Sequence, residues 1–329
     1  MFGFRTAEFA IDLGSSHIRI ANLEQGLLVS EASRAVVYQQ DKKGERIVLA
    51  HGNAVLPMHG RIPKPLEEVL VIRDGAVWDR DCLRELIRSL MVQANQRLLW
   101  VNQQLVICLP NQANLVEKKN LQKIFKEAGG GKIRFVNRSM AAASALNIPF
   151  QEPHGHFIVD IGAHTTEMTI LSCSAVVQNK LIKVGGESLS KGIVRHLRNK
   201  FRIEISLQQA ERLKEEYGSA IWIREDTGEL IEVKGISVEE SFPDSQLIDR
   251  REIVEGLSAG LKLLAENIQD FLDEVPLELA ADIADAGIIL IGGGALLEDI
   301  DDAVRNFTNL PVIIPEDPRS LAVIGALMM

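Results

Sequence analysis

The chain has 329 residues, 46% of them hydrophobic and 25% charged, which is enough to bury a sizeable core and to form two or three domains. Lys and Arg number 36 against 45 Asp and Glu, so the net charge is −9, and the absence of long runs of like charge argues against a nucleic-acid partner. The three cysteines lack disulfide or metal-ligand spacing and no long stretch is apolar throughout, so we expect a protein of the reducing cytoplasm without a membrane span.

The first half of the chain alternates strand and helix patterns. An apolar run that ends at Asp12 and a second β-prone run, Ile18 to Leu23, predict a hairpin. β-rich stretches broken by Lys, Gly and Pro predict a small inserted subdomain over residues 32–73. Asp79 is the predicted N-cap of an amphipathic helix. The expected elements are that helix to about Gln96, a strand at Leu105 to Leu109, a helix at Glu117 to Glu127, a strand at Ile133 to Val136 and a helix at Met140 to Leu146.

The second half opens with a copy of the first hairpin. Phe157-Ile-Val-Asp160-Ile-Gly162 aligns with Phe9-Ala-Ile-Asp12-Leu-Gly14, and small or hydroxylated residues follow in both. A glycine at such a turn lets backbone N–H groups approach an anion, and the neighbouring carboxylate can hold a hydrated divalent cation. The duplication therefore predicts two similar lobes, residues 1–149 and 150–329, whose turns together hold a phosphate chain.

The rest of the second half contains helices and a third glycine-rich element. We expect helices at Gly186 to Asn199, Ser206 to Glu216 with Ser206 as N-cap, and Glu252 to Leu272, a polar hairpin turn at Thr227-Gly228, and a small subdomain over residues 187–250. The run Gly287-Ile-Ile-Leu-Ile-Gly292-Gly293-Gly294 predicts a buried strand and a glycine turn, with a helix that begins near Ala295. Such a helix start presents backbone amides to a ligand.

The order of the motifs IDLGSSH, VDIGAHTT, GGE, AERLK and LIGGGALL resembles the actin-like ATPase superfamily and, within it, the MreB family of bacterial actins. The opening MFGF, the strand Val106 to Pro110, Ser139-Met-Ala-Ala-Ala143 and the stretch Pro311 to Pro318 are similar to that family in particular. The resemblance implies an α/β actin-like ATPase fold with two lobes. Each lobe would have a ribonuclease-H-like mixed sheet and a smaller subdomain, with ATP or ADP and Mg²⁺ between the lobes.

The resemblance also implies roles for individual residues. Asp12 and Asp160 would hold Mg²⁺ through water, and Glu211 and Lys214 would line the adenosine from one helix face. The other expected nucleotide contacts are Gly14, Ser15, Ser16, His17 and Ile18 in the first hairpin, Gly162, Ala163, His164, Thr165 and Thr166 in the second, Gly186, and Gly292, Gly293, Gly294, Ala295 and Leu296.

The sequence departs from the family at the phosphate end. Asn137 and Arg138 occupy the positions of a glutamate pair whose second member is thought to position the hydrolytic water. A guanidinium has no hydrogen-bond acceptor, so Arg138 cannot take that role, although it can neutralise a terminal phosphate. Ala163 and His164 replace two glycines, and Ser16-His17 replaces Ala-Asn. We therefore expect weakened nucleotide binding, a slow or absent ATPase activity and no assigned catalytic residue.

A hydrophobic segment is expected to touch the membrane. Leu98, Leu99, Trp100 and Val101 lie between polar residues, where the family carries a loop that dips into the bilayer, and Phe2 and Phe4 would add a second contact. Ordinary burial at the entry to the next strand is the alternative for Leu98 to Val101. Phe9 is expected to start the first strand and to pack in the core.

The resemblance implies a cytoskeletal protein that polymerises head to tail at the inner face of the cell membrane. Its expected partners are further copies of itself, the inner-membrane lipid surface, and membrane proteins of cell shape or wall synthesis. Two alternatives remain from the sequence: a non-polymerising actin-fold adaptor of the PilM or FtsA type, and a phosphotransferase of the sugar-kinase type. The kinase alternative lacks a catalytic carboxylate near residues 133–145, and the fold does not choose between these functions.

Overall fold

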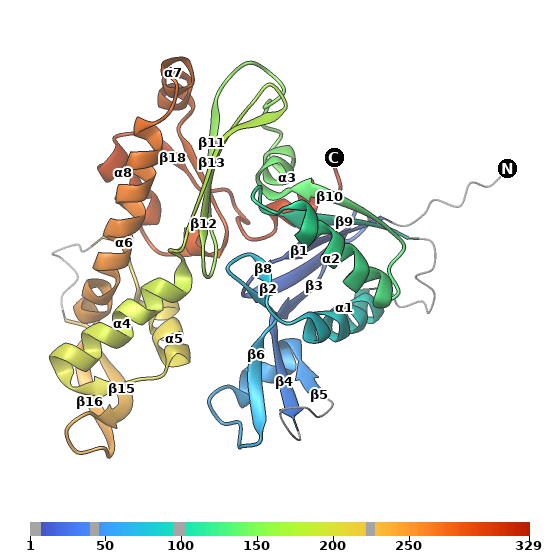
Figure 1. Cartoon of the computed structure of the whole chain (residues 1–329). Coiled ribbons are helices and arrows are strands. Elements are labelled where there is room, and N and C mark those ends of the chain that lie inside the picture. Colours follow the sequence, from blue (N-terminus) through green and yellow to red (C-terminus); the bar gives the residue numbers. More distant parts are fainter. Residues whose placement is uncertain (1–7, 40–45, 95–102, 222–227) are drawn as a thin grey trace. The chain divides into compact units, whose positions relative to one another are not determined.

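The computed structural model describes residues 8–39, 46–94, 103–221 and 228–329 (Figure 1). The chain divides into two compact units: unit 1 comprises Met1–Pro149 and Arg319–Met329, and unit 2 comprises Phe150–Pro318. Residues 319–329, which were expected in the second lobe, belong to unit 1. The reason is that α9 (Leu321–Gly325) packs on α3 (Arg138–Ala145), where a side chain in place of Gly325 would clash with the carbonyl of Ala141.

Unit 1 is built on a five-stranded sheet with the order β10-β9-β1-β2-β3. Its strands are β1 (Glu8–Leu13), β2 (His17–Asn22), β3 (Gly26–Ala32), β9 (Gln104–Leu109) and β10 (Lys132–Asn137). β1 pairs antiparallel with β2 and parallel with β9, so the predicted hairpin is confirmed. Alternate residues of β1 face opposite sides: Phe9 and Ile11 pack with helices α1 (Arg80–Ala94) and α2 (Leu115–Glu127), whereas Ala10 packs with α3 and α9.

The predicted insertion in unit 1 is a separate small sheet of order β5-β4-β6. Its elements are β4 (Arg34–Gln39), β5 (Arg46–His51), the 3₁₀ helix η1 (Gly52–Met58) and β6 (Leu66–Leu70), followed by the short pair β7 (Ile72–Arg73) and β8 (Ala76–Val77). Asp79 caps α1 as predicted, because its carboxylate accepts the N–H of Cys82 at 2.9 Å.

Unit 2 repeats the sheet order of unit 1. Its order β13-β12-β11-β17-β18 again places an antiparallel three-stranded meander beside two parallel strands. The strands are β11 (His156–Ile161), β12 (Thr166–Ser172), β13 (Ala175–Ile182), β17 (Ile288–Ile291) and β18 (Val312–Ile313). Residues of α6 (Arg250–Asp273), α7 (Leu277–Ala286) and α8 (Ile300–Thr308) complete the core around Phe157, which stacks on Phe271 with 5.3 Å between ring centroids. The repeated order supports the duplication read from the two hairpins.

A second hydrophobic cluster in unit 2 joins α4 (Gly186–Phe201) and α5 (Leu207–Tyr217) to the three-stranded sheet β14-β15-β16. These strands are β14 (Ile203–Glu204), β15 (Leu230–Ser237) and β16 (Pro243–Asp249). Ser206 caps α5 as predicted, since its hydroxyl accepts the N–H of Gln209. The predicted hairpin at Thr227-Gly228 lies partly outside the described residues, and β15 takes its partners from β14 and β16 instead.

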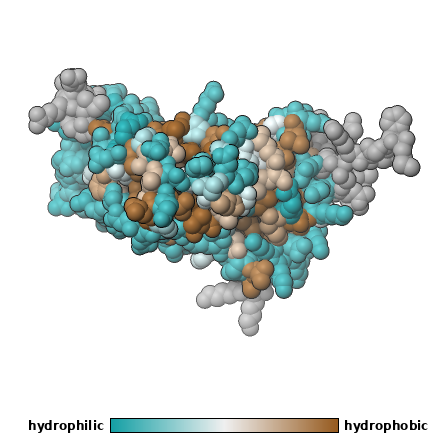
Figure 2. All heavy atoms as spheres, turned by 90° about the horizontal axis from the view of Figure 1, so that it is seen from above, coloured by the Kyte–Doolittle hydropathy of each residue, from teal (hydrophilic) through white to brown (hydrophobic). Residues whose placement is uncertain are grey.

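On the face that Figure 2 shows, apolar residues are interspersed with polar ones. Within the part of the chain that the structure describes, none of the helices combines the length and the hydrophobicity that a membrane crossing needs.

Candidate functional site

The turn of unit 1, Gly14 to Ser16, connects β1 to β2 and is held from several sides. A Cβ atom at Gly14 would lie 2.5 Å from the carbonyl oxygen of His17, so the turn requires glycine. The Ser33 hydroxyl donates to the Gly14 carbonyl at 2.5 Å, and the Ser33 N–H donates to the Ser16 carbonyl at 2.8 Å. Ser33 was missed from the sequence because it joins the turn only through pairing of β2 with β3. The Ser15 hydroxyl accepts the N–H of Gly75 at 3.4 Å.

The turn of unit 2, Gly162 to Thr165, repeats this construction between β11 and β12. The Gly162 N–H donates to the Thr165 carbonyl at 2.9 Å, and a Cβ atom at Gly162 would lie 3.0 Å from that same oxygen. The N–H groups of Gly186 and Glu187 donate to the carbonyls of Gly162 and Ala163 at 3.0 and 2.7 Å. The turn is therefore fixed to the first turn of α4.

Two residues expected to contact the nucleotide face the protein interior. Ile18 has no exposed surface and packs in the core of unit 1. Thr166 is also fully buried, and its hydroxyl donates to the Val184 carbonyl at 2.8 Å. Both stand on strands at positions whose side chains point inward. The two side chains are therefore buried within their units, and a contact of these residues with a nucleotide remains a prediction.

His164 lies at the tip of the unit 2 turn and contacts α4. Its Nε2 is 2.8 Å from a carboxylate oxygen of Glu187, which also accepts from Lys191 at 2.6 Å. Hydrogen bonding from His164, and then from Lys191, lowers the pKa of Glu187 to about 2 against the cost of burial. The His164 side chain, 9% exposed, therefore lies against the first turn of α4.

Lys214, on α5, is also drawn to the start of α4. Its ammonium group donates to the Gly186 carbonyl at 3.0 Å and to the Ser190 hydroxyl at 3.1 Å. Burial lowers the pKa of Lys214, while the nearby carboxylates of Glu211 and Glu215 act in the opposite direction. Glu211 stands one turn away on the same helix and is partly exposed. Lys214 and Gly186 thus meet beside the Gly162–Thr165 turn.

The third glycine-rich element follows β17 in unit 2. Gly292 has a φ of 85°, and a side chain there would clash with the carboxylate of Asp160 and the backbone of Ile161. Gly293 to Leu296 form a 3₁₀ helix, η2, and not the longer helix expected to begin near Ala295. Ala295 is buried, whereas Leu296 is half exposed. Unit 2 therefore brings two of the three predicted glycine-rich elements, with Gly186, Lys214 and Asp160, to one end of its sheet.

The most informative contact in unit 1 joins Arg138 to Asp12. The Arg138 guanidinium donates from Nε and Nη2 to Oδ1 of Asp12 at 3.0 and 2.9 Å, and from Nη2 to the Leu13 carbonyl at 3.2 Å. Arg19 lies on the other side, with Nη1 4.0 Å from Oδ2. Asp12 therefore does not fit its predicted role as a ligand of hydrated Mg²⁺, because its carboxylate is already engaged by cations.

His17 follows the unit 1 turn and is neutral at pH 7. Burial, and then the positive charges of Arg19, Arg319 and Arg34, lower its pKa to about 4. Its Nδ1 lies 2.9 Å from the Ser16 hydroxyl. His17 therefore brings no positive charge of its own to the turn.

Other predicted residues lie elsewhere. The membrane candidates Leu98 to Val101, Phe2 and Phe4 lie outside the described residues, and Phe9 is buried in the core as expected.

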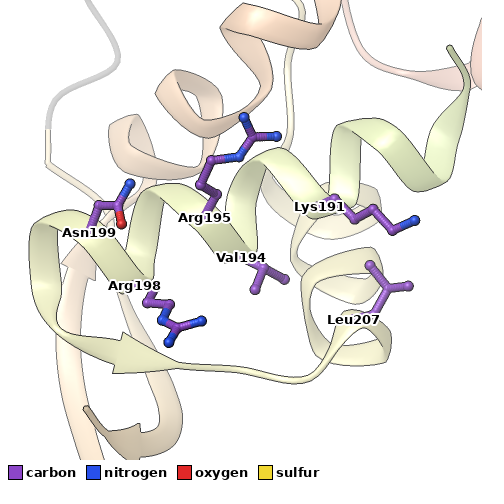
Figure 3. Close-up of a pocket in the computed structure, with 6 residues that line it drawn as sticks. All are labelled: Lys191, Val194, Arg195, Arg198, Asn199 and Leu207. Atoms are coloured by element: carbon purple, nitrogen blue, oxygen red, sulfur yellow. The ribbon is translucent and has the colours of Figure 1, made fainter.

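A groove of about 400 Å³ on α4 and α5 is distinct from the glycine turns (Figure 3). It is lined by Lys191, Val194, Arg195, Arg198, Asn199 and Leu207.

A cluster of His196, Glu252 and Glu255 links α4 to α6. The ammonium group of Lys200 lies 2.7 and 3.2 Å from the two carboxylates, so an ion-pair network accounts for these residues.

The family model described as MreB/Mbl protein matches residues 6–329. The chain belongs to the MreB/Mbl family. It is 30% identical to the cell shape-determining protein MreB of Escherichia coli K12 over 325 residues, which cover 98% of this chain and 93% of the relative.

Solved structures agree with that assignment. The crystal structure of MreB 5 of Spiroplasma citri bound to AMPPNP aligns with a TM-score of 0.90 and 25% identity, and the match covers 98% of this chain and 96% of the other. A MamK double helical filament shares the fold, with a TM-score of 0.75, 18% identity and 98% of both chains covered. The expected actin-like fold is thereby confirmed.

Proposed function

We propose that this chain is a filament-forming protein of the MreB type that binds one adenine nucleotide, ATP or ADP, with its two glycine turns. The observation that carries the proposal is the repeated construction of these turns. Each turn follows the central strand of a five-stranded sheet, β1 or β11, and the two sheets have the same arrangement of strands. Glycine turns of this kind present backbone N–H groups to phosphate. The Spiroplasma citri relative, which was crystallised with AMPPNP, supports a nucleotide as the ligand.

The adenosine end of the proposed site belongs to unit 2. Lys214 is held at Gly186, Glu211 lies on the same helix, and the Gly292 turn packs on Asp160. Lys214, Glu211 and the Gly292 turn retain the motifs read from the sequence, so we assign the adenosine to them and the phosphates to the two turns.

We further propose that the filament supports cell shape at the inner face of the membrane. The name of the Escherichia coli relative supports the role in cell shape, and family membership supports assembly with further copies of the chain. Contact with lipid through Leu98 to Val101, Phe2 and Phe4, and with membrane proteins of wall synthesis, rests on the sequence resemblance.

Hydrolysis by this chain is proposed to be slow or absent. Arg138 is the first residue of α3, and its guanidinium donates to Asp12 and to the Leu13 carbonyl. A group that only donates cannot accept a proton or a hydrogen bond from an attacking water molecule. The residue at this position therefore holds a carboxylate in place and does not activate water.

Phosphate release from the purified chain with ATP tests this proposal. We expect release close to the uncatalysed background for the wild type, and an increase of at least about tenfold for Arg138→Glu, the low end of a general-base contribution. Arg134→Gln is the control, because Arg134 forms a surface pair with Glu8 at 3.2 Å and should leave the rate unchanged. A wild-type rate that falls on Arg138→Glu would show that Arg138 promotes hydrolysis and would contradict the proposal.

A further inference from the structure

The carboxylate of Asp12 is buried between two arginines. Asp12 is 6% exposed, and the side chains of Arg138 and Arg19 are each 15% exposed. A carboxylate removed from water needs a cationic partner, and Arg138 supplies one with two donors on the same oxygen. Asp12, Arg138 and Arg19 therefore form a largely buried ion cluster in unit 1.

The charge of this cluster equals that of a carboxylate with a divalent cation. One carboxylate and two guanidinium groups leave one net positive charge, and a carboxylate that holds Mg²⁺ also leaves one. The cluster lies at the start of the Gly14–Ser16 turn, because Arg138 donates to the carbonyl of Leu13, the residue directly before Gly14. A fixed positive charge is thus already present where a phosphate chain would require one.

Arginines also surround His17, at the other end of the same turn. The pKa of His17, at the other end of the turn, is lowered to about 4 by burial and then by Arg19, Arg319 and Arg34. Of these three arginines, Arg34 pairs with Glu68 at 2.6 Å, and Arg19 belongs to the cluster around Asp12. A divalent cation placed at Asp12 would be repelled by the guanidinium groups that already occupy it.

We propose that Arg138, together with Arg19, takes the place of Mg²⁺ at the phosphate end of the site, so that the chain binds metal-free nucleotide at least as tightly as the magnesium complex. The inference rests on the proposed nucleotide binding and specifies the form of the ligand. Arginine suits this role because its charge persists at every accessible pH and its planar group reaches two oxygen atoms at once.

Equilibrium binding of a fluorescent ATP analogue to the full chain, in excess Mg²⁺ and in excess EDTA, tests the inference. We expect Mg²⁺ to give the wild type no gain in affinity. In Arg138→Gln the carboxylate of Asp12 is released, so Mg²⁺ should raise affinity by about tenfold or more, the factor that corresponds to 1.4 kcal/mol. Arg138→Lys keeps the positive charge and should behave as the wild type.

The controls separate this inference from the proposed function. Arg134→Gln should bind as the wild type does in both media, and thermal unfolding verifies that each variant is folded. If Arg138→Gln does not fold, the wild type and Arg138→Lys still decide the question. A wild type whose affinity rises about tenfold with Mg²⁺ would overturn the inference but leave nucleotide binding intact. Absence of binding in both media would overturn the proposed function and the inference with it.

Discussion

His17 links the positive charge near the Gly14–Ser16 turn to folding stability. Its folded-state pKa of about 4 lies below the ordinary value of 6.5, so protonation favours the unfolded chain. Above pH 6.5 the imidazole is neutral in both the folded and the unfolded chain, so it does not change the free energy of unfolding. As the pH falls from 6.5 to about 4, the unfolded state takes up the proton first, and stability declines over that range.

We therefore predict that His17→Asn flattens the acid side of the stability profile. The loss of unfolding free energy between neutral pH and pH 4 should be smaller than in the wild type by about 1–2 kcal/mol, after allowance for solvent screening. Chemical denaturation at a series of pH values measures this difference. His154→Asn, at an exposed position, is the matched control and should keep the wild-type slope. An unchanged slope in His17→Asn would show that neither burial nor the neighbouring arginines lower the pKa of His17.

At the scale of elements, the two hairpins were the most predictable parts of the chain. Alternating apolar residues and an Asp-x-Gly turn specify them locally, and both form as antiparallel pairs. The inward direction of Ile18 and Thr166 was missed because motif matching ignores which face of the strand a side chain occupies. The ion pair of Arg138 with Asp12 joins α3 to β1 across 126 positions, so local sequence could not reveal it.

The segment between α1 and β9 carries a prediction of its own. Leu98, Leu99 and Trp100 follow α1, which ends at Ala94. Burial of such side chains in lipid contributes about 1.5–3 kcal/mol each, so under the proposed membrane contact one subunit would bind weakly and a filament with many copies would bind firmly. Sedimentation with liposomes should be lost in a Leu99→Ser, Trp100→Ser variant but kept in Leu115→Ser, which alters an exposed leucine of α2. Full sedimentation of the double variant would exclude membrane contact through this segment.

At the scale of the whole molecule, the duplicated hairpin in the sequence predicted two lobes, and each unit indeed contains a five-stranded sheet with the same arrangement of strands. What the sequence did not indicate is the return of residues 319–329 to unit 1, because the fit of Gly325 against Ala141 depends on tertiary packing. The short strand β14 was also missed, since its partner β15 lies beyond α5 in the chain. Local patterns thus predicted the turns, whereas long-range contacts decided what each turn is packed against.

We propose that the two turns bind a single nucleotide, and calorimetric titration of the full chain with ATP tests this proposal. We predict a single class of sites with one nucleotide per chain. Two independent nucleotides per chain, or no heat of binding at any attainable concentration, would contradict the claim.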